Sequence, residues 1–222
     1  MDASGISKTV RCKFMGIAPE GVKLISIGIA ATVLSVFLCF WSKWIGVPLL
    51  VLGAAFTLFS AYFFRDPKRD KFFAPTEIAC PADGTVLSVG IEKDPDLLVV
   101  RIFLSIFNVH LQRSPMDGKV ESVSRARGKF AVAYKPEARE NERNMITITG
   151  EQGRFAHVEQ ITGAIARRIV AYVKGGDSVR ISDKIGMIYF GSQVAVYLPK
   201  GTRVMVRPGE KVYGAETVLG LW

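Results

Sequence analysis

Two long apolar stretches near the N-terminus constrain this chain more than any other feature of its sequence. Residues 24–41 and 44–64 carry no charged side chain, and only Ser42 and Lys43 separate them. Each stretch is close to the roughly 20 residues that a helix needs to cross the hydrocarbon core of a bilayer. Two such stretches joined by so short a link predict a helical hairpin that associates with a membrane.

The charges around the hairpin predict its orientation. Basic residues flank it on both sides, beginning with Lys23 and Arg65, whereas the link carries Lys43 alone. Because cytoplasmic segments are enriched in Lys and Arg, we expect residues 1–22 to form a cytoplasmic segment and residues 23–64 a hairpin that anchors the protein at the cytoplasmic face of the cell membrane. The pattern leaves open whether the hairpin spans the bilayer or lies in one leaflet.

The rest of the chain has a different character. Short runs of aliphatic and β-branched residues, such as Leu97–Leu104 and Met145–Thr149, alternate with Gly and Pro. This spacing is typical of a sandwich or barrel, so residues 65–222 are predicted to form a compact, mainly β domain of sandwich or barrel-like form. A Gly-acid-x-Val sequence occurs twice, at Gly176–Val179 and Gly209–Val212, as it does in small barrels that carry a cofactor on a lysine.

The net charge is +9, from 29 Lys and Arg against 20 Asp and Glu. A basic balance predicts an anionic partner, either nucleic acid or acidic lipid. The chain has no recognisable nucleic-acid-binding motif, so we expect lipid and no nucleic acid. Residues that could face acidic lipid are Arg125, Arg127, Lys129, Arg139, Arg143, Arg167 and Arg168.

The sequence gives no sign of a metal site. Its three cysteines, Cys12, Cys39 and Cys80, are far apart, and its two histidines are His110 and His157. None of these residues has the spacing of metal ligands or of a disulfide framework. We therefore expect no bound metal, and His157 is interpreted as structural.

Three polar positions within the β region could carry chemistry. Asp83 lies in Pro81-Ala82-Asp83-Gly84, which has the composition of a turn. His110 lies in a polar patch with Asn108, Gln112 and Arg113, and histidine is the side chain best suited to proton transfer near neutral pH. Gly191-Ser192 interrupts a strand-like run from Ile185 to Pro199. A glycine in such a run often marks a bulge or a close backbone approach.

Two kinds of chemistry would use Ser192. It could be the nucleophile of a hydrolase with His110 and Asp83, although the G-x-S-x-G signature is absent. Alternatively, its hydroxyl could attack the carbonyl of Gly191, which has no side chain to block the approach. The peptide would become an ester, and elimination followed by hydrolysis would leave a pyruvoyl group. The centre of the run from Ile185 to Pro199 is Gly191-Ser192, so it holds no lysine to which a cofactor could be attached.

Four segments in order resemble the motifs of the phosphatidylserine decarboxylase family, in its short bacterial and archaeal form. They are Phe64-Arg65-Asp66-Pro67-Lys68-Arg69, Pro81-Ala82-Asp83-Gly84, Phe103-Leu104-Ser105 through Asn108-Val109-His110, and Phe190-Gly191-Ser192. The similarity covers roughly residues 61–222. The resemblance implies a proenzyme that cuts itself between Gly191 and Ser192 into a β chain, 1–191, and an α chain, 192–222, which remain associated. A homodimer is left open.

The resemblance also implies a covalent pyruvoyl cofactor derived from Ser192. This group would form a Schiff base with phosphatidylserine, an anionic phospholipid, and yield phosphatidylethanolamine and CO2, with Asp83 and His110 assisting. How His110 divides its work between self-cleavage and decarboxylation stays open. Longer members of the family carry two histidines close together in this region, whereas Arg113 stands at the place of the second here.

Two alternatives remain at this point. The first is a membrane-tethered, barrel-like adaptor module without catalytic activity, which would account for the hairpin and the strands but not for Gly191-Ser192. The second is a decarboxylase that acts on a lipid with a related headgroup, such as archaetidylserine.

Overall fold

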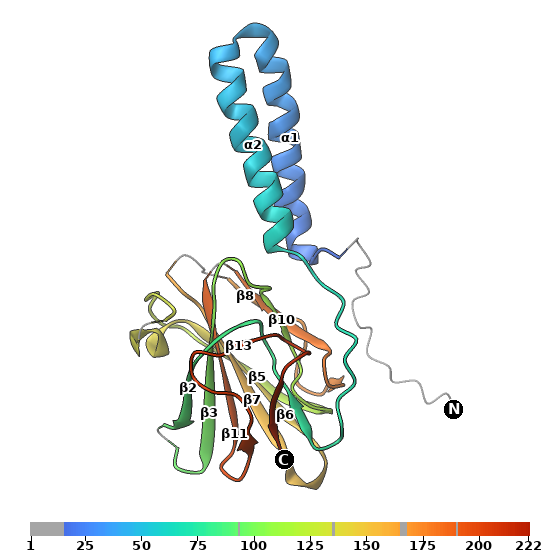
Figure 1. The fold of residues 1–222 in the computed structure, drawn as a ribbon, viewed down its shortest axis with the longest axis vertical. Coiled ribbons are helices and arrows are strands. Elements are labelled where there is room, and N and C mark those ends of the chain that lie inside the picture. The colour runs from blue at the N-terminus through green and yellow to red at the C-terminus, as the bar shows by residue number, and fades with distance from the viewer. Residues whose placement is uncertain (1–15, 93, 135, 165–167, 190) are drawn as a thin grey trace, which may run out of the picture. The chain divides into compact units, whose positions relative to one another are not determined.

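The computed structural model describes residues 16–92, 94–134, 136–164, 168–189 and 191–222. This part of the chain divides into two compact units, one that ends at Lys68 and one that begins at Arg69. The first unit is helical and the second is built of strands (Figure 1).

The first unit is a helical hairpin, as predicted. Helix α1 runs from Pro19 to Trp41 and α2 from Lys43 to Phe63, and both are long and apolar enough to cross a membrane. Gly28 and Gly53 lie where the helices touch, each packed against a threonine of the other helix. Small residues at such contacts let two helices approach closely. Large apolar side chains point outward, including Phe40, Leu52 and Leu58, so the hairpin surface suits a lipid environment.

The second unit is almost entirely β. Its strands are β1 (Glu77–Ala79), β2 (Gly84–Ile91), β3 (Leu97–Leu104), β4 (Leu111–Arg113), β5 (Gly118–Ala126), β6 (Arg143–Thr149), β7 (Phe155–Ile161), β8 (Ile169–Ala171), β9 (Ser178–Val179), β10 (Lys184–Ile188), β11 (Ser192–Pro199), β12 (Arg203–Val204), β13 (Lys211–Val212) and β14 (Val218–Leu221). Two short 3-10 helices, η1 (Pro136–Glu140) and η2 (Glu151–Gly153), lie in its loops.

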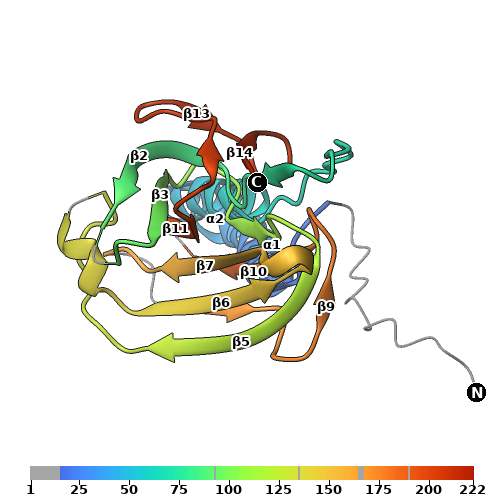
Figure 2. The same cartoon turned by 90° about the horizontal axis from the view of Figure 1, so that it is seen from below.

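Eight strands form one antiparallel sheet in the order β13-β2-β3-β11-β7-β6-β5-β9. Figure 2 shows how this sheet curls into half a barrel. Two three-stranded sheets, β1-β14-β12 and β4-β10-β8, complete the unit. The core contains the inward side chains of the central strands, such as Leu104, Ile146, Val158 and Val194. The predicted mainly β, barrel-like fold with an N-terminal hairpin is therefore confirmed.

The two edge strands of the curled sheet repeat one local structure. Gly209 before β13 and Gly176 before β9 have positive φ angles of 86° and 95°, which glycine adopts without strain. Gly209 donates its N–H to the carbonyl of Val86 and Gly176 donates to Val120, both at 2.8 Å. The two Gly-acid-x-Val sequences are thus equivalent turns that attach an edge strand to β2 and to β5.

Asp83 and Asp117 occupy matching places in this repeat. Asp83 Oδ1 accepts a hydrogen bond from the N–H of Gly214, after β13, at 2.8 Å. Asp117 Oδ1 accepts one from the N–H of Ile181, after β9, at 2.7 Å. Each aspartate directly precedes the glycine that begins β2 or β5. The Pro-x-Asp-Gly-x-Val sequence that starts at Pro81 recurs at Pro115, so one part of Asp83's role is structural.

Candidate active site

The Gly-Ser pair lies where the chain crosses between two sheets. Strand β10 ends at Ile188 in a three-stranded sheet, and β11 begins at Ser192 in the curled sheet. Gly191, between them, has a φ of +66°, a left-handed conformation that glycine adopts most readily. The pair is therefore a bend between two strands and not a bulge within one strand. Phe190 lies outside the described residues.

The carbonyl of Gly191 is packed against Gly163. Strand β7 pairs with β11 up to Ile161, opposite Gln193, and Gly163 follows two residues later. A Cβ atom at position 163 would overlap the carbonyl oxygen of Gly191. The place of this carbonyl thus depends on the absence of a side chain at 163.

Ser192 is fully buried. It pairs with Leu104 of β3, and its exposed fraction is 0%. Its Oγ has no hydrogen-bond partner among the residues that the structure describes. A buried hydroxyl without a partner costs roughly 1–3 kcal/mol, and such groups in native proteins call for an explanation, such as a catalytic role.

The loop from Ser105 to His110 connects the two strands that flank the crossing. It starts after Leu104, opposite Ser192, and returns at His110, whose carbonyl accepts the N–H of Ile188 at 3.2 Å. Asn108 Oδ1 closes the loop by accepting from the N–H and the Oγ of Ser105, at 2.9 and 2.8 Å. The fold therefore brings Ser192 and His110 to the same end of the curled sheet.

The His110 ring has a defined tautomer. Its Nδ1 lies 2.9 Å from the carbonyl oxygen of Asn108, and because a carbonyl can only accept, Nδ1 carries the proton. In the neutral ring Nε2 then carries the lone pair. Nε2 is buried, so it is the atom of this ring that can take up a proton inside the site.

A chain of buried amides fixes the backbone at His110. Gln112 Nε2 donates to the carbonyl of His110, Gln160 Nε2 to Gln112 Oε1, and Asn144 Nδ2 to Gln160 Oε1, each at 2.8 Å. Gln112, which the sequence places in a polar patch with His110, thus holds the His110 backbone in position. Gln160 and Asn144 were missed. The sequence feature that could have indicated them is a polar residue on the inward face of an otherwise apolar strand. Asn144, for example, shares the inward face of β6 with Ile146.

Asp83 and Arg113 belong to the frame around the site. Asp83 Oδ2 accepts from Arg69 at 2.9 Å, and both side chains are at least 91% buried. Arg113 donates its N–H to the carbonyl of Pro81 at 2.9 Å and one guanidinium nitrogen to the carbonyl of Ser182 at 3.1 Å. These bonds tie the start of β2 to β4, the strand that follows His110.

His157 lies away from these residues, whereas Cys80 lies beside the Asp83 turn, where its thiol donates to the carbonyl of Ala82 at 3.2 Å. His157 pairs across the sheet with Tyr197, five residues along β11 from Ser192, and its Nδ1 lies 3.0 Å from the hydroxyl of Thr147. Burial raises the pKa of the Cys80 thiol to about 12. Because only the thiolate is a good nucleophile, Cys80 is a structural residue.

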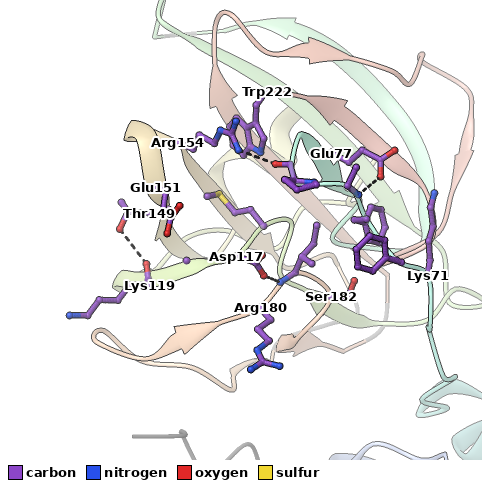
Figure 3. Close-up of a pocket in the computed structure, with 18 of the residues that line it drawn as sticks. Lys71, Glu77, Asp117, Lys119, Thr149, Glu151, Arg154, Arg180, Ser182 and Trp222 are labelled. Carbon is purple, nitrogen blue, oxygen red and sulfur yellow. Dashed lines mark hydrogen bonds between the residues drawn. The ribbon is translucent and has the colours of Figure 1, made fainter. Parts of the chain in front are cut away.

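A broad groove of about 910 Å³ opens near the other aspartate of the repeat (Figure 3). Its lining includes Lys71, Asp117, Arg180 and Trp222, but neither His110 nor Ser192 is among the described residues that form it. Ser192 and His110 are instead closed off from solvent, each with an exposed fraction of 0%.

Comparison with known proteins places this site in a family. The family model described as phosphatidylserine decarboxylase matches residues 56–220. The phosphatidylserine decarboxylase proenzymes of Burkholderia vietnamiensis and Burkholderia lata are 42% and 41% identical to this chain over 167 residues. The matched region is 73% of this chain and 78% of each relative.

The chain belongs to the phosphatidylserine decarboxylase family. The same extent of similarity, 42% over 167 residues, relates it to the phosphatidylserine decarboxylase proenzyme of Burkholderia multivorans. The resemblance read from four short segments is thereby confirmed. The family match runs from before β1 to residue 220, within β14, and hence covers every residue of the site.

The two equivalent aspartates provide a matched pair of variants. Asp83→Asn removes a charge from a buried pair with Arg69, whereas Asp117 is exposed. We expect Asp83→Asn to lower the free energy of unfolding by about 1–3 kcal/mol and to slow self-cleavage. Asp117→Asn should cost less than about 0.5 kcal/mol and leave cleavage unchanged. Urea unfolding and denaturing gels measure both effects, and equal effects from the two variants would contradict this assignment.

His157 should contribute to pH-dependent stability without taking part in catalysis. Burial lowers the pKa of the His157 ring below its ordinary value, against smaller opposing effects of Glu121 and Asp94. The neutral His157 ring therefore contributes fully to the free energy of unfolding above its pKa in the unfolded chain, near 6.5. This contribution is lost as the pH falls through its lower pKa in the folded protein. His157→Gln should reduce the loss of stability between pH 7.5 and pH 5 in urea unfolding. Loss of lipid conversion at pH 7.5 in a folded variant would show that the residue is catalytic.

Proposed function

We propose that this chain is a phosphatidylserine decarboxylase that cuts itself between Gly191 and Ser192 and converts phosphatidylserine to phosphatidylethanolamine and CO2. The observation that carries the proposal is the buried Ser192 hydroxyl without a described partner, directly after a glycine with positive φ. In a chain of this family, such a hydroxyl is placed to react with its own backbone.

The cut follows from the groups on either side of the bond. Ser192 Oγ adds to the carbonyl carbon of Gly191 while its proton goes to Nε2 of His110. His110 then gives this proton to the nitrogen of residue 192 as the C–N bond breaks, which leaves an ester and a free amine. Elimination across Cα and Cβ of residue 192 releases the Gly191 carboxylate, and hydrolysis then releases ammonia and leaves a pyruvoyl group. The products have 191 and 31 residues (222 − 191).

The surroundings of residue 192 fit a pyruvoyl group. The family and the word proenzyme in its relatives' names support a cofactor made by self-processing, and Ser192 is the residue proposed as its source. The group is small and has neither a hydroxyl nor an N–H, so it suits a buried place where the serine Oγ has no described partner. When present, it supplies a carbonyl that binds the substrate amine and accepts the electron pair as CO2 leaves.

The chain's own residues would supply the proton and exclude water. His110, fixed by Asn108 and by Gln112, can hold on Nε2 the proton that the product carbon needs. The core behind Ser192 is apolar, with Val194 and Leu104 among its nearest strand neighbours. Such an environment favours the loss of a carboxylate charge. Asp83 is proposed to assist by holding the start of β2 in place.

Burial argues against the hydrolase alternative. A serine hydrolase must present its nucleophile to an outside substrate, whereas Ser192 and His110 both have an exposed fraction of 0%. A sealed hydroxyl suits a reaction within the chain, after which the cut ends can separate and admit a lipid. The adaptor alternative gives no reason for a buried hydroxyl that lacks a described partner.

We propose that the hairpin holds the protein at the cytoplasmic face of the cell membrane, within reach of its lipid substrate. The apolar outer surfaces of α1 and α2 support this anchoring. Most of the basic residues expected to face lipid have acidic partners instead: the pairs are Arg125–Glu142, Lys129–Glu140, Arg139–Glu92 and Arg143–Glu159. Arg167 lies outside the described residues. The hairpin, more than this set of charges, is therefore expected to provide attachment.

The two cleavage products are proposed to stay together. Strand β11 belongs to the 192–222 product. It pairs along its length with β3 and from Gln193 to Tyr197 with β7, both of the 1–191 product. A strand held on both sides does not leave a sheet without breaking two ladders of hydrogen bonds. A homodimer stays a prediction.

Ser192→Ala should give a full-length chain that does not convert lipid, because no hydroxyl remains to attack Gly191. The matched control is Ser182→Ala, which removes another buried hydroxyl without a partner among the described residues but not one that follows a glycine. Denaturing gels and a phosphatidylserine conversion assay in detergent would be used, with archaetidylserine assayed in parallel. Normal conversion by the Ser192→Ala chain would refute the proposal, and preference for archaetidylserine would reassign the substrate.

Gly163→Ala tests whether the position of the Gly191 carbonyl matters for the cut. The added Cβ overlaps that oxygen, and displacement of a reacting group by about 1 Å can slow a reaction roughly 100-fold. Full-length chain should accumulate on denaturing gels after expression. Gly201→Ala is the control, because a Cβ there meets open space. Cleavage of folded Gly163→Ala at the wild-type rate would contradict the expectation.

A further inference from the structure

Gln193 directly follows the cleavage position and points to the opposite face of β11 from Ser192. Its side chain is 3% exposed, and both ends of its amide are bonded. Oε1 accepts from Arg101 Nη1 at 2.8 Å, and Nε2 donates to the carbonyl of Ala133 at 2.9 Å. A buried amide with a donor and an acceptor satisfied in this way has one orientation, so the backbone at 193 is fixed from the side.

The first of these partners, Arg101, is rigid. It lies on β3, is 5% exposed, and makes two hydrogen bonds of 2.7 Å to the carboxylate of Glu92. Arg139 contacts the same carboxylate at 3.1 Å. A planar guanidinium held in this bidentate manner has little freedom, so its remaining nitrogen, Nη1, is directed at Gln193.

The second partner, Ala133, is held by a separate set of bonds. Asn141 is fully buried and bonds both the N–H and the carbonyl of Ala131, at 2.7 and 2.8 Å, as well as the carbonyl of Thr162 at 2.7 Å. The neighbouring Tyr134 packs edge-on against Phe103, with ring centroids 5.8 Å apart. The loop that contains Ala131, Ala133 and Tyr134 is therefore attached both to β3 and to the segment that follows β7.

These contacts connect what would become two separate chains. Arg101 and Ala133 belong to residues 1–191, and Gln193 belongs to residues 192–222. Before the cut, the backbone through Gly191 also restrains residue 192. After the cut, residue 192 is a chain end, and chain ends fray unless they are tied down.

We propose that Gln193 is the positioning residue that keeps the group at position 192 aligned with His110 after self-cleavage. This inference rests on the proposed function, because it concerns the cut chain. Gln193 does not touch the reacting atoms. It acts through the backbone of β11, using Arg101 and Ala133 as fixed points.

The decisive experiment compares Gln193→Met in the cut and the uncut protein by hydrogen exchange and mass spectrometry. The uncut background is Ser192→Ala, in which the chain stays continuous. In the cut protein, amides at the start of β11 should exchange about fivefold faster or more, the effect of losing one net hydrogen bond. In the uncut background the same substitution should change exchange by less than about twofold. Equal changes in both backgrounds would mean an ordinary structural role and would overturn the inference.

Kinetics give a second readout. In cut Gln193→Met, kcat should fall about 10- to 100-fold, the scale expected for a misplaced reacting group, while KM stays within about twofold because substrate contacts are unchanged. Tyr197→Phe is the matched control. It removes a part-buried 2.8 Å bond to Glu159 on the same face of the same strand, far from the chain end. It also removes a weaker 3.5 Å contact with Arg101, whose bonds to Glu92 and Gln193 remain, so kcat should stay unchanged. A kcat loss as large in Tyr197→Phe would contradict the proposal.

Arg101→Lys provides a second variant in case Gln193→Met does not fold. Lysine keeps a cation beside Glu92 but lacks the planar fork that also reaches Gln193. It should reproduce the exchange pattern in weaker form, and wild-type exchange in its cut form would overturn the inference. The two proposals can fail separately. A wild-type chain that stays uncut refutes the proposed function. If the wild-type chain is cut but Gln193→Met has the same effect on exchange in the cut and uncut proteins, only the role of Gln193 is refuted.

Discussion

The peptide bond between Gly191 and Ser192 is held by strands of two different sheets, and the rest of the site depends on this constraint. On one side Ile188 is bonded to the carbonyl of His110, and on the other Ser192 pairs with Leu104. The link between them must bend, and Gly191 does so at a φ of +66°. The Ser192 hydroxyl next to this bend is buried and has no hydrogen-bond partner among the described residues.

The two faces of β11 have different tasks around this bend. On the inner face, amide side chains from Asn144 to Gln112 fix the backbone of His110. On the outer face, Arg101 and the Ala133 carbonyl hold Gln193. Buried polar networks of this kind cost free energy unless every member is bonded, and when satisfied they favour one arrangement. Their positions beside the bond that is proposed to be cut indicate that the fold is rigid there.

The hairpin, the mainly β domain and the family could be predicted from the sequence because each follows from a local pattern. Uncharged stretches of membrane length indicate helices, short runs between Gly and Pro indicate strands, and Gly191-Ser192 with His110 and Asp83 in order indicates the family. The bend at Gly191 could not be predicted, since an apolar run from Ile185 to Pro199 reads the same whether it stays in one sheet or crosses between two.

The sequence also could not predict three sets of contacts. These are the chain of buried amides from Asn144 to Gln112, the hydrogen bonds of Gln193, and the equivalent hydrogen bonds of Asp83 and Asp117. They join residues far apart in sequence through side-chain orientation, which a single sequence does not encode in a readable pattern. The repeat at Pro115 is an exception, because its Pro-x-Asp-Gly-x-Val sequence is visible once Asp83 has been singled out. It shows that Asp83, which is proposed to assist the reaction, also makes a structural hydrogen bond equivalent to the one that Asp117 makes.

The central claim is that Ser192 cuts its own chain, and intact mass spectrometry of the purified protein tests it most directly. The account predicts two fragments of 191 and 31 residues, the shorter one lighter by one ammonia than a fragment headed by serine. A preparation that converts phosphatidylserine while its mass corresponds to one continuous chain, with serine still joined to Gly191, would contradict it.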